Sequence, residues 1–300
     1  MLLCETISLN KMEKNKFYSS ETGSKKIRSC NIQQDKREAQ TIYNFISWFA
    51  GFTDGDGCFN IYIYPKEDKI TFTFKISLTQ TNKRALISMK KHLKHGNISK
   101  VDSNQMVHYR ITRIKDLNHT ILPLFDTIPL QTEKLICYLM FKQCLMIYQD
   151  STKTLEQRIK EIIYLRKNPP LVMLNNKSKR VYNKWWLVGF IEAEGSFYLT
   201  KKAKDRIVHG FGITQKLDKH VLDQVRYELG IKPVVRWNKS GFWSLDATGI
   251  NDIKRIKVYF FNSFKGITSL YYRIWARSLK HKGKYQKLLS VQGKIRQWKK

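Results

Sequence analysis

Two pairs of acidic residues have the type and spacing that metal-assisted chemistry requires. Asp54 and Asp56 form one pair, Glu192 and Glu194 form the other, and each pair is followed by a glycine. Hard cations such as Mg²⁺ bind carboxylate, carbonyl, water and phosphate oxygens, and bound metal ions can activate water and neutralise charge during phosphodiester hydrolysis. A calcium-binding EF-hand loop beginning at Asp54 would need a glutamate where this chain has Pro65. We therefore interpret the acids as candidate Mg²⁺ ligands and reject the calcium loop.

Each acidic pair ends an apolar segment, and the two segments are copies of one another. The first, at 49–57, reads FAGFTDGDG, and the second, at 187–195, reads LVGFIEAEG. Both have the apolar content of a buried helix, and a glycine at such a place is the usual left-handed helix stop. The sequence therefore predicts a duplicated unit in which each half contributes one acid-bearing helix.

A small residue recurs at every fourth position of both predicted helices. Small residues at this spacing allow two helix backbones to approach closely, so we expect the two helices to pack on each other. Their last acids, Asp56 and Glu194, would then lie side by side. Carboxylates at helix C-termini oppose the helix dipole and repel each other, so a cation is expected between them. The small residues are Gly51, Gly55, Gly189 and Ala193.

The composition points to a polyanionic partner. The chain has 55 basic and 24 acidic residues, a formal net charge of +31, and is rich in aromatic residues. Such a chain is expected to bind nucleic acid. A membrane is the weaker candidate, because no apolar run is long enough for a spanning helix and no basic amphipathic anchor is evident. With 300 residues and 42% hydrophobic residues, the chain can form two domains with their own cores.

The duplicated motif resembles that of the LAGLIDADG family of homing endonucleases, in the form that carries two motifs on one chain. The resemblance implies an α+β fold of two pseudo-symmetric αββαββα halves. Each half would have a saddle-shaped antiparallel sheet, and the two motif helices would form the interface. The implied function is that of a monomeric, sequence-specific endonuclease. It would cut double-stranded DNA at a long asymmetric target by metal-dependent phosphodiester hydrolysis, with no membrane and no obligate protein partner.

The resemblance also assigns roles within the motifs. It makes Asp56 and Glu194 the metal ligands, with the backbone carbonyls of Gly55 and Ala193 nearby. Mg²⁺ is the implied cofactor, and Ca²⁺ is expected to bind without supporting cleavage. The first acids of the motifs, Asp54 and Glu192, are expected to cap or brace the interface.

Three further catalytic residues follow from the resemblance. Gln80 and Gln215 stand at matched places and are expected to orient solvent around the metals. Lys134 matches a lysine that the family carries near the start of the last helix of each half. The second half departs from this pattern, because Thr268 stands at the matching place, with Lys265 about one turn earlier as a candidate substitute.

The segments that follow each motif are predicted to be strands with one polar face. Residues 70–79 alternate strictly between apolar and polar side chains, which is typical of a half-buried strand. A two-stranded ribbon fits the major groove, where polar side chains can distinguish base pairs. In the second half, Gly210 and Gly212 occupy reading positions, so contacts there should be sparse or backbone-mediated. The predicted DNA-binding residues are Asn60, Tyr62, Tyr64, Thr71, Thr73, Lys75, Ser77, His108, Arg110, Ser196, Tyr198, Thr200, Lys202, Arg206 and Arg236.

Composition and turn signals divide the chain. The first residues are polar without sustained periodicity, and two prolines followed by a polar basic run mark a linker. The predicted parts are an N-terminal extension at 1–40, a first half at 41–165, a linker at 166–183 and a second half at 184–300. The first half is predicted to contain strands at 58–64, 70–79, 98–101 and 106–112, and helices at 81–95, 115–125, 131–149 and 152–166. The second half is predicted to repeat this order, with helices at 184–194 and 218–229 and strands at 196–201, 206–214, 231–237 and 242–248.

The sequence leaves two other functions open and suggests a location. One is an RNA maturase on the same scaffold, which would assist group I intron splicing and bind intron RNA. The other is a DNA-binding regulator whose motifs are only an interface. Retention of both acids favours the nuclease. Acids at Glu5 and Glu13 argue against a transit peptide, and abundant Lys, Asn, Ile and Tyr suit an AT-rich genome. We therefore expect synthesis inside a mitochondrion.

Overall fold

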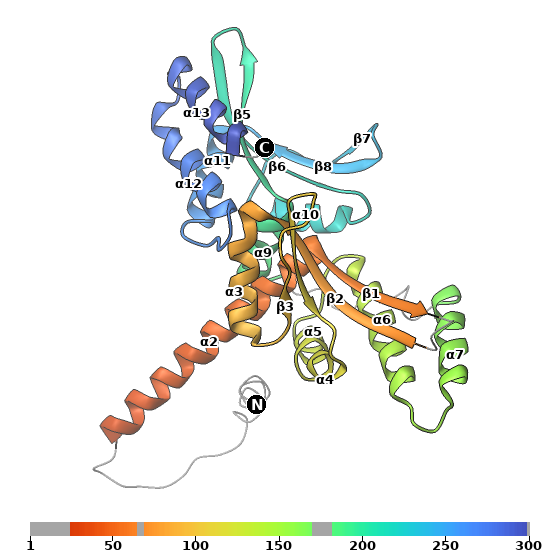
Figure 1. Cartoon of the computed structure of the whole chain (residues 1–300). Coiled ribbons are helices and arrows are strands. Elements are labelled where there is room, and N and C mark those ends of the chain that lie inside the picture. The colour runs from red at the N-terminus through yellow and green to blue at the C-terminus, as the bar shows by residue number, and fades with distance from the viewer. Residues whose placement is uncertain (1–24, 65–68, 170–181, 299–300) are drawn as a thin grey trace.

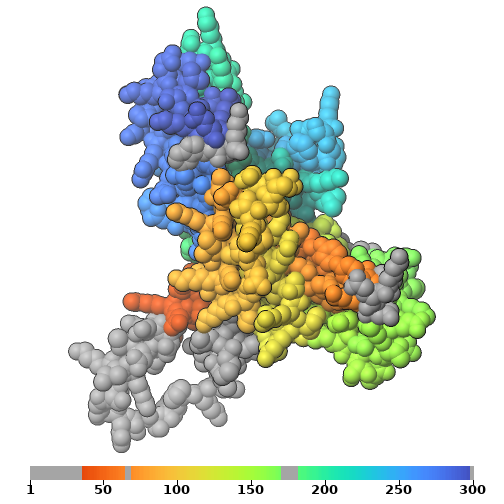
Figure 2. All heavy atoms as spheres, viewed as in Figure 1, coloured from red at the N-terminus to blue at the C-terminus, as the bar shows by residue number. Residues whose placement is uncertain are grey.

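The structure consists of two halves with the same order of elements (Figure 1). It is a computed structural model that describes residues 25–64, 69–169 and 182–298. Figure 2 shows the halves as separate bodies that meet in the middle of the molecule. Most of the predicted linker lies outside the described residues.

The first half begins with the long helix α2 and ends with a helical hairpin. Its elements are α2 (Lys25–Asp56), β1 (Gly57–Tyr64), β2 (Lys69–Thr79), η2 (Gln80–Asn82), α3 (Lys83–Leu93), β3 (Asn97–Ile98), β4 (Met106–Ile111), α4 (Ile114–Asp116), η3 (Leu117–Ile121), α5 (Leu122–Thr127), α6 (Lys134–Gln149) and α7 (Leu155–Lys167). Helix α2 starts within the segment assigned to an extension. The sequence missed this start because its described residues before Tyr43 are mostly exposed and show no apolar periodicity.

The second half repeats the pattern. Its elements are α9 (Lys184–Glu194), β5 (Ser196–Ala203), β6 (Arg206–Gln215), α10 (Lys219–Glu228), β7 (Arg236–Asn238), β8 (Phe242–Ala247), α11 (Ile250–Tyr259), α12 (Thr268–Ser278), η4 (Leu279–His281) and α13 (Tyr285–Trp298). The two antiparallel sheets have the matching orders β1-β2-β4-β3 and β5-β6-β8-β7. The predicted α+β fold is therefore confirmed, although β3 and β7 are shorter than predicted.

Alternation along the strands separates a core face from a polar face in each sheet. In the first half, Phe59, Phe72 and Phe74 point into the core, where Phe59 packs against Phe125 and Phe141. In the second half the matching rings are Phe197 and Phe211. Helices cover these core faces, so the polar faces stay open. Within the described ranges, no helix combines the length and apolarity that crossing a membrane requires.

The two motif helices, α2 and α9, pack backbone to backbone. A Cβ added to Gly51 would overlap the carbonyl oxygen of Trp186, and a Cβ added to Gly189 would overlap the carbonyl oxygen of Trp48. Below this crossing, a Cβ added to Gly55 would lie 3.1 Å from Cγ of Glu194. The predicted contact between the small-residue stripes is confirmed, and it fixes how close the helix ends lie.

The glycines that end the motifs do not adopt the backbone conformation that was predicted for them. Neither Gly57 nor Gly195 has a positive φ angle, and Gly195 is extended at φ −79° and ψ 149°. The predicted left-handed stop is therefore wrong at both places. A side chain is excluded there because a Cβ on Gly57 would overlap Thr53, and one on Gly195 would lie 2.6 Å from the carbonyl oxygen of Ile191. Glycine lets the chain turn from helix into strand against the last helical turn.

His209 is a buried titratable group in the core of the second half. Its Nε2 lies 2.7 Å from Oγ of Ser278 on α12, and its ring packs edge-on against Trp275. Burial lowers the pKa of His209 from 6.5 to about 4, because the charged form cannot be solvated. The folded state therefore binds the proton less readily than the unfolded state.

We predict that replacing either crossing glycine destabilises the protein and stops DNA cleavage. Gly51→Val or Gly189→Val forces the helices apart, which should cost about 1–3 kcal/mol of unfolding free energy. The matched control is Gly293→Val on α13, where an added Cβ meets nothing within 4 Å. Melting curves and cleavage assays test this. Wild-type melting and cleavage in the two interface variants would disprove the close crossing.

We predict a pH-dependent loss of stability that depends on His209. The stability that depends on keeping the buried His209 ring neutral is fully present above pH 6.5, and it is lost as the pH falls from 6.5 towards about 4. The reason is that the unfolded histidine takes up a proton first, and the total loss is on the order of 3 kcal/mol. In urea titrations at pH 7 and pH 4.5, His209→Gln should reduce the difference in stability between the two pH values. An unchanged difference would contradict this assignment.

Candidate active site and nucleic-acid interface

The last acids of the two motifs lie together at the ends of α2 and α9. Asp56 and Glu194 are both half-buried. Burial, and next the charge of Glu194, raise the pKa of Asp56 to about 7. Burial also raises the pKa of Glu194. Because the charge of Glu194 disfavours ionisation of Asp56, a cation beside the two carboxylates would be stabilised.

Lys134 supplies one positive charge beside this pair. It stands at the start of α6, and its Nζ donates a hydrogen bond to the carbonyl oxygen of Gly55. The Lys134 charge acts against burial and lowers the pKa of both Asp56 and Glu194. The structure therefore brings together three of the residues that the sequence singled out for catalysis.

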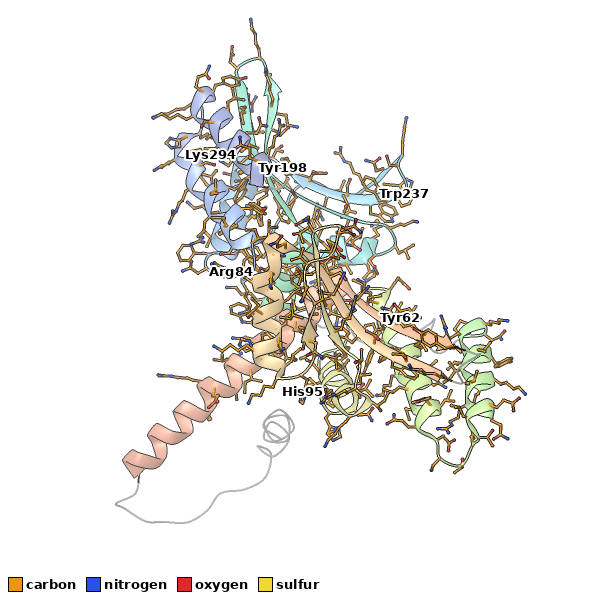
Figure 3. All side chains as sticks on the ribbon, in the orientation of Figure 1. Tyr62, Arg84, His95, Tyr198, Trp237 and Lys294 are labelled. Carbon is orange, nitrogen blue, oxygen red and sulfur yellow. The ribbon has the colours of Figure 1, made fainter. Side chains whose placement is uncertain are left out.

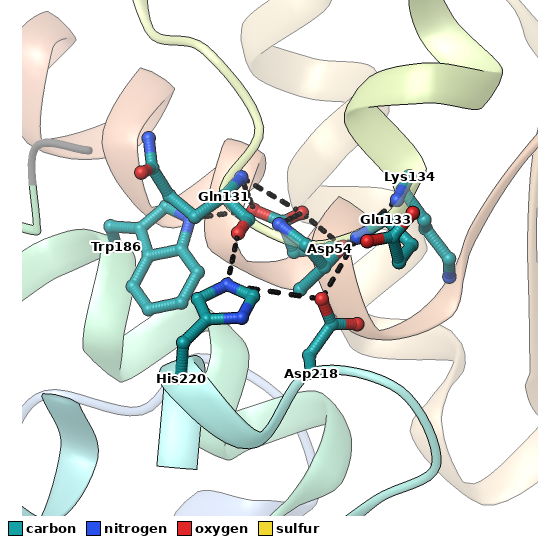
Figure 4. A network of polar contacts seen from close by, with 8 residues as sticks. Asp54, Gln131, Glu133, Lys134, Trp186, Asp218 and His220 are labelled. Carbon is teal, nitrogen blue, oxygen red and sulfur yellow. Dashed lines mark hydrogen bonds and ion pairs between the residues drawn. The ribbon is translucent and has the colours of Figure 1, made fainter. Parts of the chain in front are cut away.

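The first acids of the motifs brace the interface, as expected. Asp54 accepts hydrogen bonds from the backbone N–H groups of Gln131 (2.9 Å) and Thr132 (3.0 Å), from the Thr132 hydroxyl (2.6 Å) and from the Trp186 indole (2.7 Å) (Figure 4). The first two donors precede α6 of the same half, whereas Trp186 lies on α9 of the other half. Burial raises the pKa of Asp54, and these donors lower it. Asp54 therefore ties α6 to the motif helices.

Glu192 repeats this arrangement in the second half. It accepts hydrogen bonds from the backbone N–H groups of Lys265 (3.0 Å) and Gly266 and from the Trp48 indole (2.8 Å). Burial raises the pKa of Glu192, and these bonds lower it. The two tryptophan bonds could not be predicted from the sequence, because each tryptophan has the character of one more apolar residue of its helix.

Two further hydrogen bonds cross between the halves at equivalent places. The backbone N–H of Glu133 donates to Asp218 (3.0 Å, Figure 4), and that of Ile267 donates to Asn82 (2.9 Å). On the first side, the His220 ring also lies 3.1 Å from the Gln131 carbonyl oxygen. These bonds connect the end of the second strand of one half to the loop before the last helices of the other.

Matching hydrogen bonds show that Lys134 and Thr268 occupy equivalent positions in the two halves. Residues 131–134 and 265–268 make matching bonds to the first acid of their own half and to the opposite half. The Thr268 hydroxyl donates to the carbonyl oxygen of Glu192 (3.2 Å). Nζ of Lys265 lies instead over the rings of Trp48 and Trp185, 5.6 and 6.0 Å from their centres. Lys265 therefore does not substitute for Lys134, and the site is asymmetric.

The two predicted glutamines are placed differently. The side chain of Gln215 donates a hydrogen bond to Glu194, which lowers the pKa of that acid. Gln80 is exposed, and its backbone N–H donates to the carbonyl oxygen of Gln105 (2.8 Å). In the part of the chain that the structure describes, its side chain makes no hydrogen bond. Only the second half therefore brings its glutamine to the acids, beside an open groove lined by Glu194, Thr214, Gln215, Lys216, Ser240, Gly241 and Phe242.

The donors at the helix ends suit a hard divalent cation. Asp56 and Glu194 supply carboxylates, and Gly55 and Ala193 supply carbonyl oxygens within the same turns. Among the described residues, no group of three or more His, Cys, Asp and Glu side chains is placed to hold a metal. A cation here would therefore need oxygens from water or phosphate as well, which Mg²⁺ commonly takes.

The predicted DNA-binding residues of the first half share the polar face of its sheet. The register places Lys75 opposite Cys58 and Arg110, and Tyr62 opposite Thr71. Tyr62 is 46% exposed and visible on this sheet in Figure 3. The other members of the set on this face are Asn60, Tyr64, Thr73, Ser77 and His108.

Two residues of that set are less available than predicted. Thr73 is only 6% exposed, in the middle of the sheet. The ring nitrogens of His108 lie 2.9 Å from Oγ of Ser77 and 3.1 Å from a carboxylate oxygen of Asp102. Asp102 and Ser77 therefore hold the imidazole in one orientation on the sheet.

The second sheet has a feature that the sequence did not reveal. Tyr198 lies across Gly210 and Gly212, because a Cβ on Gly210 would overlap its ring and one on Gly212 would lie 3.2 Å from it. The Tyr198 hydroxyl donates to Asp246 on β8 (3.0 Å). The glycines thus make room for a flat ring instead of leaving the face bare. Asp246 was missed because it pairs with Gly212 only across the sheet.

The remaining predicted residues of the second half lie along the same face. Ser196 and Thr200 pair with positions on β6, Arg206 begins β6, and Arg236 pairs with Ser244 on β8. Lys202 is exposed at an irregularity between β5 and β6. Trp237, 55% exposed on β7 at the edge of this sheet (Figure 3), pairs with Trp243 and so lies on the opposite face from Arg236.

Comparisons with known proteins agree with this architecture. The family model of LAGLIDADG endonuclease matches residues 49–145 and 187–277. A Schizosaccharomyces pombe protein named "Probable intron-encoded endonuclease Cox1-I1b" is 34% identical, covering 95% of this chain and 76% of that protein. A Neurospora crassa protein named "Probable intron-encoded endonuclease 3" is 23% identical, covering 76% of this chain and 49% of that protein.

Solved structures share the fold. One is I-SmaMI bound to uncleaved DNA in the presence of calcium ions, with a TM-score of 0.72 and 23% identity, covering 85% of this chain and 97% of that one. Another is the LAGLIDADG meganuclease I-CpaMI bound to uncleaved DNA, with a TM-score of 0.73 and 18% identity, covering 83% and 98%. Both motif copies lie within the regions that match the family model. The chain therefore belongs to the LAGLIDADG endonuclease family.

Proposed function

We propose that this chain is a homing endonuclease that cuts both strands of a long, asymmetric DNA target. The observation that carries the proposal is the carboxylate pair Asp56 and Glu194, held where two polar sheet faces meet. The similar chains I-SmaMI and I-CpaMI are described as bound to DNA. The named relatives are called endonucleases, which favours DNA cleavage over the maturase activity considered from the sequence.

The two sheets supply the DNA-binding surface. Their polar faces carry tyrosines, lysines, arginines and hydroxyl side chains, which can contact both phosphates and base edges. The net charge of +31 favours association with a polyanion. Side chains on the polar faces select the bases, and the basic residues around these faces provide general affinity for DNA.

The acids at the helix ends hold the cation on which hydrolysis depends. Asp56 and Glu194 provide the charged ligands, and the carbonyls of Gly55 and Ala193 lie in the same turns. When bound, a divalent metal activates water and neutralises charge at phosphorus. We propose Mg²⁺ as the working metal and Ca²⁺ as one that binds without supporting cleavage. The calcium-containing I-SmaMI complex with uncleaved DNA supports this division.

Lys134 and Gln215 assist the two acids. The charge of Lys134 stands beside both carboxylates, where it can offset the negative charge that develops on the phosphate. Gln215 orients the carboxylate of Glu194 through its hydrogen bond. Because Thr268 carries no charge, the two DNA strands meet unequal catalytic groups.

We propose synthesis within a mitochondrion as the origin of this protein. Its relatives include intron-encoded proteins of fungi and an uncharacterized mitochondrial protein of Saccharomyces cerevisiae, which is 28% identical over 57% of this chain. The intron-derived names support an intronic reading frame that is translated in place.

We predict that Asp56→Asn or Glu194→Gln reduces DNA cleavage to background while DNA affinity stays near that of the wild type. The variants remove a metal-binding charge, whereas affinity is distributed over many phosphate contacts. The assay incubates the full chain with a pool of long duplexes, with and without Mg²⁺, and sequences the cut ends. Asp223→Asn, at a partly exposed acid, and Glu156→Gln, at an exposed acid, serve as charge-matched controls. Wild-type cleavage by both active-site variants would refute the assignment.

We predict that the asymmetry between Lys134 and Thr268 produces a nicked intermediate. Lys134→Met should slow cleavage by about 10²–10³-fold, as expected for losing one charge-stabilising group. Thr268→Lys should shorten the life of the intermediate, because it gives the second half the group it lacks. Supercoiled plasmid carrying the cut site reports nicked and linear products separately. Simultaneous cutting of both DNA strands by the wild type would contradict the prediction.

A further inference from the structure

Helices α11–α13 cover the second sheet on the side away from its polar face. On α12, Trp275 and Tyr272 pack against Phe197 with ring centres 5.1 and 5.2 Å apart. On α13, the side chain of Gln292 donates to the carbonyl oxygen of Leu199 (2.7 Å). Phe197 and Leu199 point to the core, whereas the residues between them point to the polar face. The outer side of these helices is therefore remote from the proposed DNA-binding face.

The charged residues of this outer side are almost all basic. Asp252 is the only acidic residue between Ile250 and Lys300, and it is buried and paired with Arg255. In the part of the chain that the structure describes, the exposed cations of α12, η4 and α13 make no ion pair. We define the back surface as Arg273, Arg277, Lys280, Lys282, Lys284, Lys287, Lys294 and Arg296. Figure 3 labels Lys294 on this layer, and Figure 2 shows the layer open to solvent.

The charges of the back surface are concentrated around η4. Desolvation, and then the charges of Lys280, Lys287 and Lys284, lower the pKa of His281. Three ammonium groups from η4, its following turn and α13 thus act on one ring. Like charges held this close repel each other, and a bound polyanion would relieve the repulsion.

The first half provides an internal comparison. Its helices α6 and α7 occupy the equivalent layer, and Arg166 of α7 donates to the carbonyl oxygen of Ile61 as Gln292 does to Leu199. Three lysines of that layer are paired with acids. Its ion pairs include Lys142 with Asp126 (2.7 Å), Lys153 with Glu161 (2.6 Å) and Lys160 with Glu156 (2.7 Å). The same layer therefore exists with acids among its cations, whereas residues 268–298 contain no acid at all. The fold does not require a back surface without acids.

We propose that the back surface is a second nucleic-acid-binding site, which holds the phosphodiester backbone of a double-helical segment while the sheet faces hold the DNA target. Lysines and arginines spread over two helices match the regular phosphates of a helix and favour backbone contacts over base reading. A membrane fits less well, because Leu288 and Ile295 of α13 are buried in the core. The helix keeps no broad apolar face for insertion. This site goes beyond the proposed nuclease function and does not depend on it.

The experiment compares two variants of the full chain that lose the same charge. The back-surface variant carries Arg277→Gln, Lys280→Gln, Lys284→Gln and Lys287→Gln. The control variant changes residues in the matching layer of the first half, none of them placed in the active site or on the polar face. It carries Lys142→Gln, Lys153→Gln, Lys160→Gln and Lys167→Gln. Each protein is first saturated with an unlabelled DNA duplex without divalent metal. It is then titrated with a labelled RNA hairpin, a labelled second DNA duplex or phosphatidylserine vesicles.

The wild type should form a ternary complex that contains the labelled nucleic acid. The back-surface variant should bind the label at least about tenfold more weakly and show a shallower salt dependence, because it makes fewer phosphate contacts. The control variant should bind like the wild type. Binding of the RNA hairpin alone would identify RNA as the partner, and binding of both labels would identify a general double-helix backbone.

Three results would overturn the proposal. The first is the absence of a ternary complex. The second is equally weakened nucleic-acid binding in both variants, which would indicate that binding depends on diffuse charge. The third is binding of vesicles in place of nucleic acid. Cleavage of target DNA is followed in parallel. The back-surface variant should cut at the wild-type rate, and a wild type that fails to cut would refute the nuclease function while leaving the ternary-complex result to stand.

Discussion

The close contact between α2 and α9 determines the rest of the structure. Gly51 and Gly189 let each backbone lie against a carbonyl group of the other helix, and no side chain larger than hydrogen fits there. Because the helices cross so closely, their ends converge, and Asp56 and Glu194 share one site. The sheets begin directly after these ends, so their polar faces are set on either side of the same point.

The first acids of the motifs convert this contact into a rigid frame. Asp54 and Glu192 are buried, and each is satisfied by backbone N–H groups of its own half and by a tryptophan of the other. Loss of such donors would leave a buried carboxylate without hydrogen bonds, which strongly destabilises a folded protein. The halves therefore hold each other's charges in place, and Lys134 is positioned by the same loop that caps Asp54.

The strands and the acid pair were predicted well because both depend on local patterns, and the fold of two halves was predicted from the resemblance to a known family. Strict alternation marked the strand at 70–79, and the repeated motif placed Asp56 beside Glu194. Features that arise from contacts between distant segments could not be read in this way. The sequence suggested a left-handed turn at Gly57, whereas the glycine is needed for space beside the preceding turn. Trp186 read as an apolar helix residue, although its indole completes a buried hydrogen-bond network across the halves.

Tyr198 limits the order in which substitutions can be accepted on the polar face of the second sheet. Its ring fills the space above Gly210 and Gly212, and Asp246 holds its hydroxyl. Any side chain at position 210 would collide with the ring, so new reading groups cannot arise there one at a time. A smaller residue at position 198 has to come first, and it would remove the hydroxyl group that donates to Asp246. Positions 198, 210, 212 and 246 are therefore coupled, and side chains on this part of the proposed DNA-binding face can change only together.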